Sequence, residues 1–316
     1  MVVGSQGMCV NKSPRIVSLL ASATEIVCAL GAQDSLVGVS HGCDFPAGVS
    51  KLPHLTKSIV GPNLTSRQVD DLVSAASKEG RSLYELDEKL LQALSPELVI
   101  TQELCDVCAV GFATVASALG SLKSKAQLVS LQPGSIEEIL IDVSKVGAAI
   151  GAEVQAQALV DDAHRRLQVL KERVQSLPSP KVLTLEWFDP AFFGGHWVPE
   201  QVKHAGGISL IGKSHERSER MSWEQVNALD PDIILLMPCG YDLKGCVSLA
   251  KELDSTPTWG NLRAVRSKNV WALDANSFFS RPSPRVITGA EILGHIFHPE
   301  HVPCPTDVDS HQRLIE

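Results

Sequence analysis

Four cysteine and histidine side chains have the types and spacing that metal or thiol chemistry requires. Cys105 and Cys108 form a C-x-x-C pair, and His41 and Cys43 form an H-x-C pair. A C-x-x-C pair ahead of a helix can hold a thiolate at lowered pKa, and it can also supply two metal ligands. Zinc accepts three cysteines and one histidine in a tetrahedral site. The four residues are therefore a candidate set for zinc or iron binding or for redox chemistry.

The other cysteines have a simpler interpretation. The chain holds eight cysteines, and Cys28, Cys239 and Cys246 fall where cysteine usually packs as a small apolar residue. Without an export signal, the thiols are expected to be reduced rather than paired in disulfides. Packing is also the alternative role for the candidate metal set.

A second group of residues suits the binding of a flat ligand. Trp187 ends a predicted strand, where its rigid face suits stacking on a ligand or the sealing of an interface between lobes. Arg281 follows Phe278 in a loop before the last helix, and its guanidinium suits a carboxylate or amide of a ligand. His196 and Trp197 either cap the same cleft or pack against it.

A repeating pattern of strands and helices must position these residues. Short apolar runs alternate with helical segments, and this alternation predicts parallel sheets with helices on their faces. The runs lie at 15–20, 36–39, 98–101, 127–131, 181–187, 233–237 and 270–273. In open α/β sheets a ligand binds beyond the carboxyl ends of the strands, so the loops after these runs are expected to line one cleft.

A long helical stretch separates two similar halves. Residues 135–177 contain no proline, and their apolar residues recur at helical spacing. Ser135 and Glu138 predict a capping box at the start, and Pro178 marks the end. We expect one helix up to 148–151 and a longer one after it.

Two segments on either side of this stretch resemble each other. LLQALSPELVI at 90–100 matches QVNALDPDIIL at 225–235, and each predicts a helix, a proline turn and a buried strand. Two copies predict paired lobes bridged by the helical stretch. The expected division is a disordered leader at 1–13, lobes at 14–134 and 179–298, connecting helices at 135–178 and a loose tail at 299–316.

The composition argues against several classes of protein. The formal net charge is −8 and the pI is near 5.7, which argues against nucleic-acid binding. No apolar run reaches the ~18 residues of a membrane span. The first residues lack the basic head and apolar stretch of a secretory signal, so a cytoplasmic location is expected.

Several segments resemble a known family. RIVSLLASATEIVCALG, VGVSHGCDFP, LEWFDPAFFGGHWVPEQVKHAGG, MSWEQVNALDPDIILLMPCG and FFSRPSPRV look like those of cobalamin-binding, BtuF-like proteins, which are class III, helical-backbone substrate-binding proteins. The resemblance covers nearly the whole chain, from Pro14 to His298. It implies a periplasmic-binding-protein-like α/β fold, in which two Rossmann-like lobes joined by a long helix close slightly around a ligand. It implies capture and delivery of a small molecule, and no enzyme activity.

The resemblance also assigns roles to single residues. Relatives line the cleft with aromatic side chains and an arginine; Trp187, Phe278 and Arg281 fall at such positions, whereas Gly42 and Gln102 replace aromatic residues. The candidate ligand-binding residues are His41, Gly42, Gln102, Trp187, Phe192, His196, Trp197, Phe278 and Arg281.

Docking on a membrane permease is a further property of the family, which uses one carboxylate per lobe. Glu224 matches the second carboxylate, while the first position holds Lys89 with Glu88 beside it. The shifted charge and the missing export signal argue against coupling to a permease. The expected partner is a small molecule, with no nucleic acid and no membrane insertion.

Two functions follow from these observations. The first is a protein that captures cobalamin, another corrinoid or a related tetrapyrrole or metal chelate in the cleft. The alternative is a metal-binding or redox protein that reuses the fold, with His41, Cys43, Cys105 and Cys108 as its zinc or iron ligands or as ligands of a corrin metal. An enzyme is not expected, since the chain shows neither a nucleotide-binding glycine motif nor a nucleophile elbow.

Overall fold

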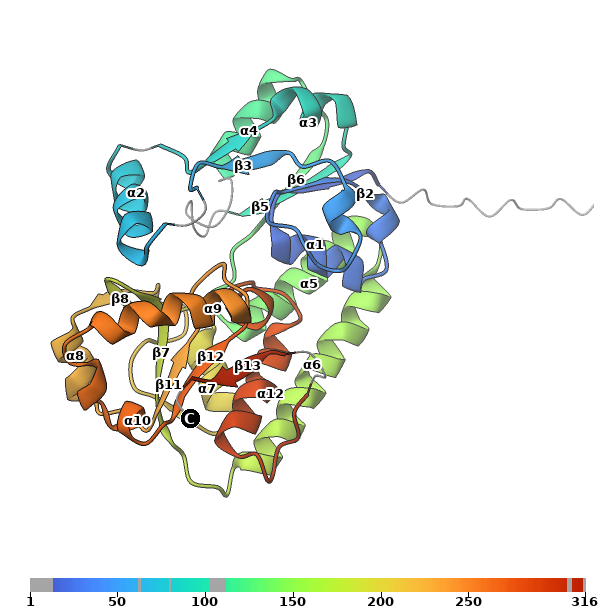
Figure 1. Ribbon diagram of the computed structural model, residues 1–316. Helices are drawn as coiled ribbons and strands as arrows, with labels where there is room; N and C mark the ends of the chain where they lie inside the picture. The colour runs from blue at the N-terminus through green and yellow to red at the C-terminus, as the bar shows by residue number, and fades with distance from the viewer. Residues whose placement is uncertain (1–13, 62–63, 80, 103–111, 306–308, 315–316) are drawn as a thin grey trace, which may run out of the picture.

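The computed structural model describes residues 14–61, 64–79, 81–102, 112–305 and 309–314 of the 316-residue chain. These residues form two α/β lobes connected by two long helices (Figure 1). The predicted fold class, two Rossmann-like lobes with a helical connection, is confirmed. Cys105 and Cys108 lie outside the described residues.

The N-terminal lobe is built on a four-stranded parallel sheet in the order β2-β1-β5-β6. Successive residues of a strand face opposite sides of a sheet, and Ile16 and Val17 accordingly pack in different apolar clusters. Helices lie on both faces. The elements are β1 (Ile16–Ser18), α1 (Ala21–Ala29), β2 (Leu36–Val39), α3 (Glu88–Leu94), β5 (Leu98–Gln102), α4 (Phe112–Ser121) and β6 (Gln127–Leu131).

A two-stranded ribbon packs against this lobe beside its main sheet. Strands β3 (Thr56–Ser58) and β4 (Tyr84–Leu86) pair antiparallel, and the chain between them contains helix α2 (Ser66–Lys78). Neither strand was expected from the sequence, because three residues are too short to show an alternating pattern.

The C-terminal lobe holds a seven-stranded mixed sheet. Its order is β10-β8-β7-β11-β12-β13, and β9 also pairs with β7. The strands are β7 (Lys181–Phe188), β8 (Ala191–Phe193), β9 (Ile208–Ser209), β10 (Arg220–Met221), β11 (Ile233–Leu236), β12 (Val270–Leu273) and β13 (His311–Arg313). The helices are α7 (Val198–His204), α8 (Trp223–Leu229), α9 (Leu243–Leu249), α10 (Arg263–Arg266), α11 (Ala275–Phe278) and α12 (Val286–Phe297).

The two lobes repeat the same strand order, and they share one hydrogen bond at equivalent positions. The parallel strands β9-β7-β11-β12 repeat the order β2-β1-β5-β6 of the first lobe. Helices α3 and α8 both end at a residue with positive φ, Ser95 and Asp230, immediately before the proline. In each lobe the carboxylate that follows this proline accepts a hydrogen bond from a backbone amide at the start of the lobe's first strand. Glu97 accepts from the Arg15 amide, and Asp232 accepts from the Lys181 amide.

Two consecutive helices brace the lobes. α5 (Ile136–Ile150) packs Ile139 in the core of the C-terminal lobe and Val146 in that of the N-terminal lobe, and α6 (Glu153–Val174) runs back across both. They separate at Gly151, whose φ of +71° suits glycine. The capping box is only half formed, because the Ser135 side chain accepts from the Glu138 amide but the Glu138 carboxylate binds the Gly134 amide.

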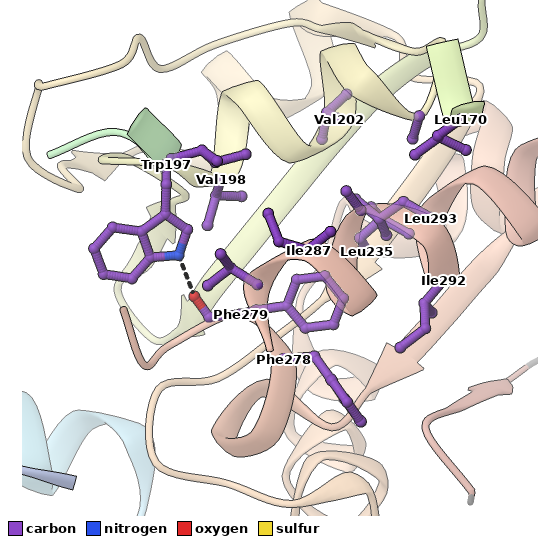
Figure 2. Packing of buried hydrophobic residues seen from close by; sticks show 14 of the residues in the cluster. Leu170, Trp197, Val198, Val202, Leu235, Phe278, Phe279, Ile287, Ile292 and Leu293 are labelled. Carbon is purple, nitrogen blue, oxygen red and sulfur yellow. Dashed lines mark hydrogen bonds between the residues drawn. The ribbon is translucent and has the colours of Figure 1, made fainter. Parts of the chain in front are cut away.

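The core of the C-terminal lobe includes part of the segment after residue 298. Figure 2 shows this core, in which α6, α7, β11 and α12 contribute Leu170, Val202, Leu235 and Leu293. Val302 is buried in the same cluster, and β13 pairs antiparallel with β12. The expectation of a loose tail was therefore wrong for these residues. Among the residues described, no helix has the length and apolar character needed to cross a bilayer.

Candidate functional site

Side chains near the carboxyl ends of strands from both lobes meet in one region, which we call the lobe junction. Glu25 lies in α1, which follows β1, and Asp44 lies in the loop after β2. Trp187 is near the end of β7, and Arg281 follows β12. Parallel strands place their carboxyl ends at one edge of a sheet, and here the two edges face each other. The predicted convergence of these loops is thus present for the residues named.

Two arginines of the C-terminal lobe hold two carboxylates of the N-terminal lobe. Arg281 Nη1 donates to Glu25 Oε1 at 3.1 Å and to Asp44 Oδ1 at 2.5 Å, and its Nη2 donates to the Gly42 carbonyl oxygen at 3.0 Å. Arg285 Nε donates to Glu25 Oε2 at 2.8 Å. Two positive and two negative groups therefore balance across the junction.

Burial and charge act against each other in this cluster. Only 3% of the Glu25 side chain and 11% of the Arg281 side chain are exposed, whereas 56% of Asp44 is exposed. Burial alone disfavours the charged form of Asp44, but hydrogen bonds and the charge of Arg281 outweigh it and lower the pKa of Asp44. Burial likewise opposes the charge of Arg281, but Asp44 and Glu25 raise its pKa. Asp44 and Arg281 therefore stabilise each other's charged forms.

Trp187 reaches across the junction from the C-terminal lobe. Its Nε1 donates to the Ser66 carbonyl oxygen at 2.9 Å, and its ring lies 6.0 Å from that of Tyr241. Phe192, its cross-strand neighbour in β8, lies under the Arg220 guanidinium at 5.5 Å. Trp187 thus joins the two lobes through this hydrogen bond, and its stacking on a ligand stays a prediction.

The candidate metal set does not come together within the described residues. His41 is exposed, and its Nδ1 lies 2.7 Å from Thr56 Oγ1. Cys43 is 2% exposed, and its Sγ lies 3.1 Å from Thr24 Oγ1 and 3.2 Å from Ser40 Oγ. Burial raises the pKa of Cys43 against the opposing effect of these hydrogen bonds.

Cys43 packs in the apolar core of the N-terminal lobe. Within the described residues, no three histidine, cysteine or carboxylate side chains form a group able to hold a metal ion. The remaining members of the set, Cys105 and Cys108, lie outside these residues.

Other candidate residues belong to the core of the C-terminal lobe. Trp197 is 5% exposed and its Nε1 donates to the Phe279 carbonyl oxygen at 2.8 Å, as Figure 2 shows. Phe278 is 8% exposed in the same cluster. These aromatic side chains pack the lobe, so of the two roles considered for Trp197 the structure favours packing. In the other lobe, Gln102 is buried at the end of β5.

His196 and Glu186 are two further titratable side chains of the C-terminal lobe. Burial, followed by the charge of Arg217, lowers the pKa of His196, whose buried Nδ1 has no hydrogen-bond partner. Burial raises the pKa of Glu186 to about 7, and Ser218 Oγ donates to its carboxylate at 2.5 Å. His196 therefore favours its neutral form at neutral pH, where Glu186 is close to half protonated.

The two candidate docking carboxylates occupy similar exposed places on repeated helices. Glu88 is the first residue of α3, and Glu224 is the second residue of α8. A carboxylate in the first turn of a helix interacts favourably with its dipole. Hydrogen bonds from Ser222 and from its own backbone lower the pKa of Glu224. The structural counterpart of Glu224 in α3 is Lys89.

Two hollows lie away from the lobe junction. One, of about 610 Å³, is lined by residues of β6 and α5, such as Val129 and Lys145. The other, of about 390 Å³, lies between α6 and Val302. At the junction itself, the polar contacts described above join the lobes, so a ligand entering there must displace some of them.

Sequence reasoning missed four residues of the junction: Glu25, Asp44, Ser66 and Arg285. Arg285 lies four residues after Arg281 in the segment RPSPR, and this spacing was the available signal. Nothing local connects Glu25 with residues some 260 positions away, since only folding brings them together.

The fold and the junction define a solute-binding receptor with two lobes. A model of the periplasmic binding protein family matches residues 16–277, and the chain belongs to this family. Proteins of this family are receptors that bind solutes. The family identification thus agrees with the resemblance found in the sequence.

Two relatives with similar sequences are a transporter lipoprotein and a vitamin-binding protein. An uncharacterized ABC transporter substrate-binding lipoprotein, YvrC of Bacillus subtilis, is 24% identical over 94% of this chain and 84% of its own length. A vitamin B12-binding protein of Vibrio cholerae is 25% identical over 88% of this chain and 86% of its own length.

Solved structures share the fold. The periplasmic vitamin B12-binding protein BtuF of Vibrio cholerae has a TM-score of 0.65 at 21% identity, covering 91% of this chain and 98% of that one. A periplasmic heme-binding protein of Pseudomonas aeruginosa has a TM-score of 0.69 at 22% identity, covering 93% and 96%.

These relatives correct the expected location. They are periplasmic proteins or lipoproteins of ABC transporters, which conflicts with the prediction of a cytoplasmic protein. That prediction rested on the first residues of the chain alone, and the family resemblance over residues 16–277 outweighs it.

Proposed function

We propose that the protein captures a corrinoid, or a related tetrapyrrole or metal chelate, between its two lobes. The observation that carries the proposal is the lobe junction, where Trp187 and Arg281 extend from strand ends of one lobe to the other. A tryptophan face suits a flat macrocycle, and a guanidinium suits its carboxylate or amide side chains. Relatives named for vitamin B12 and heme support this ligand class.

Binding at this place requires an exchange of contacts. In the structure, Trp187 donates to Ser66, and Arg281 pairs with Glu25 and Asp44. A ligand side chain replaces the most exposed of these partners, Asp44, at the least cost, because a half-exposed carboxylate is readily rehydrated. The two helices α5 and α6 keep the lobes together during this exchange.

We also propose that the exposed carboxylates Glu88 and Glu224 contact a transporter component. The support is their exposed placement in the first turns of α3 and α8 and a relative named as an ABC transporter substrate-binding lipoprotein. Reversal of both charges is expected to weaken delivery to such a component without changing ligand binding.

A spectroscopic titration tests the ligand. Purified protein is titrated with aquocobalamin, with hemin and with a ferric hydroxamate, and absorbance change and co-elution on gel filtration are recorded. We expect at least one of them to bind, and Trp187→Ala and Arg281→Ala to weaken its binding about tenfold or more.

Matched variants outside the junction serve as controls. Trp271→Ala removes a β12 tryptophan that donates a hydrogen bond to Asn269, and Arg263→Ala removes an arginine paired with Asp230 and Asp232. Arg281→Lys keeps the charge if the alanine variant folds poorly. Binding of none of the three ligands, or equal binding by the junction and control variants, would overturn the proposal.

A further inference from the structure

Helix α2 differs from the other helices of its lobe in what it contacts. It leaves the tip of the β3–β4 ribbon, where the Ile59 amide donates to the Leu83 carbonyl oxygen at 3.0 Å. Figure 1 shows it standing apart from the sheet of its own lobe and next to the C-terminal lobe. The side chains and main chain at its inner end bond to that lobe.

Those bonds to the C-terminal lobe are polar. Arg67 pairs with Asp189 in the turn after β7, and Arg220 of β10 donates to Asp70 at 2.8 Å and to Ser74 at 2.8 Å. The Ser66 amide donates to Glu252 at 3.3 Å.

The apolar side of α2 is incompletely covered. Val69, Leu72, Val73 and Ala76 recur at the spacing of one helix face. In an ordinary surface helix such a face is buried on the core, but here Ala76 alone of the four is buried, and Leu72 is 44% exposed. Hydrophobic packing therefore contributes little to holding this helix in place.

The ion pairs that do hold it are exposed on at least one side. The side chains of Arg67 and Asp189 are 55% and 49% exposed; Arg220 is 53% exposed, whereas its partner Asp70 is 10% exposed. Exposed pairs stabilise weakly and are screened by salt. The contact is thus strong enough to orient the helix and weak enough to release.

Release of α2 would uncover Trp187. The Ser66 carbonyl oxygen, at the first residue of α2, accepts the Trp187 Nε1 hydrogen bond. As long as α2 is in place, the indole edge is occupied by the helix. Opening at the ribbon frees that edge, and reclosure restores the hydrogen bond to Ser66.

We propose that α2 is a strap that closes over the lobe junction and controls entry and exit of the ligand. The strap consists of residues 66–78, hinged on the β3–β4 ribbon and fastened by the Arg67–Asp189 and Asp70–Arg220 pairs. The proposal rests on the proposed function for the identity of what enters. The opening motion itself needs no ligand.

Hydrogen–deuterium exchange on the full chain tests the motion. Double variant Arg67→Ala with Arg220→Ala is compared with Arg263→Ala, which also breaks two exposed ion pairs but far from the strap. We expect amide exchange in 66–78 to rise roughly three- to tenfold in the double variant and to stay unchanged in the control. Salt at about 0.5 M should also raise amide exchange in 66–78 of the wild type, and it should change exchange in the double variant little.

A charge-swap variant shows whether faster exchange comes from loss of the ion pair or from damage to the fold. Asp70→Arg combined with Arg220→Asp restores the attraction and should return exchange in 66–78 toward the wild-type rate. Unchanged exchange in the double variant, or an equal rise in Arg263→Ala, would overturn the strap.

Ligand kinetics test the control of access. With hemin and aquocobalamin as probes, bound ligand should slow exchange in the strap, and the double variant should release it several times faster than wild type and Arg263→Ala. Equal release rates with an opened strap would refute the gating role and leave the proposed function intact. Failure of every variant to bind either probe would count against the proposed function, while the exchange rates would still decide whether the strap opens.

Discussion

Glu25 is the most buried charged side chain of the arginine–carboxylate cluster, with 3% of its side chain exposed. It accepts hydrogen bonds from both Arg281 and Arg285. A buried carboxylate persists in charged form only where such partners compensate for lost hydration. The residue thus links α1 of one lobe to the loop before α12 of the other.

Loss of this charge should destabilise the whole protein. Glu25→Gln leaves two largely buried guanidiniums with one carboxylate, and we expect the free energy of unfolding to fall by about 3 kcal/mol in urea denaturation. The matched control is Glu79→Gln, which removes an exposed partner of Arg81 and should cost less than about 1 kcal/mol. Equal effects of the two substitutions would contradict this account.

Asp142 gives the stability a pH dependence. Burial raises its pKa from the ordinary 3.8 to about 7, while Lys145 acts in the opposite direction and Glu138 adds to the rise. Between these values the folded protein holds a proton that the unfolded chain has released, so stability falls as pH rises through this window. Below this pH window, Asp142 is neutral in the folded and the unfolded protein, so its protonation does not change the stability.

A variant without this proton should lose that pH dependence. Asp142→Asn should match the wild type near pH 4 and become more stable by about 2 kcal/mol at pH 8, as followed by urea denaturation at each pH. Glu137→Gln, which changes an exposed carboxylate of the same helix, should leave the wild-type profile unchanged. A constant difference between Asp142→Asn and wild type across pH would refute the assignment.

At the scale of elements, the turn between α5 and α6 decides how the lobes are braced. Gly151 ends α5 with a positive φ, and the chain then reverses so that both helices contact both lobes. A side chain at this position is strained even though the space around it is open. The conformation is therefore set by the backbone and not by packing.

Two glycine substitutions test this point. Gly151→Ala should lower the free energy of unfolding by about 1 kcal/mol because alanine disfavours positive φ. Gly120→Ala lies inside α4 with open space around its Cβ position and should raise stability by about 0.5–1 kcal/mol. Thermal denaturation of both variants checks the opposite signs; a shared sign would contradict the explanation.

At the scale of the whole molecule, the helical brace limits how far the lobes can separate. The apolar clusters of both lobes share α5 and α6, whereas the junction is held by polar contacts. Breaking the junction should therefore loosen it locally without parting the lobes. This behaviour suits a receptor that admits a ligand with little movement of its halves.

Small-angle scattering can check this rigidity. We expect the radius of gyration of an Arg281→Ala, Arg285→Ala double variant to stay the same as that of wild type, since the brace is untouched. Arg263→Ala serves as the control for loss of a surface arginine. A clear increase in radius for the double variant alone would show that the junction, and not the brace, holds the lobes.

The sequence by itself determined the repeat and the elements that carry it. Local signals fixed them: the proline after each of α3 and α8, the apolar runs of the parallel strands, and Ser135 and Pro178 around the helical stretch. Such signals act over a few residues, so they can be recognised without tertiary structure. The sequence did not predict ribbon β3–β4 or strand β13, because these three-residue strands take their stability from partners distant in the chain.

Only the tertiary structure decided which side chains serve the junction. Types and spacing marked Trp187 and Arg281, but they also marked Trp197 and Phe278, which fill the core, and Cys43, which is buried beside Thr24. Side-chain type does not reveal which face of an element will meet the other lobe. Glu25, Asp44 and Arg285 became visible only when folding placed opposite charges from the two lobes within hydrogen-bonding distance.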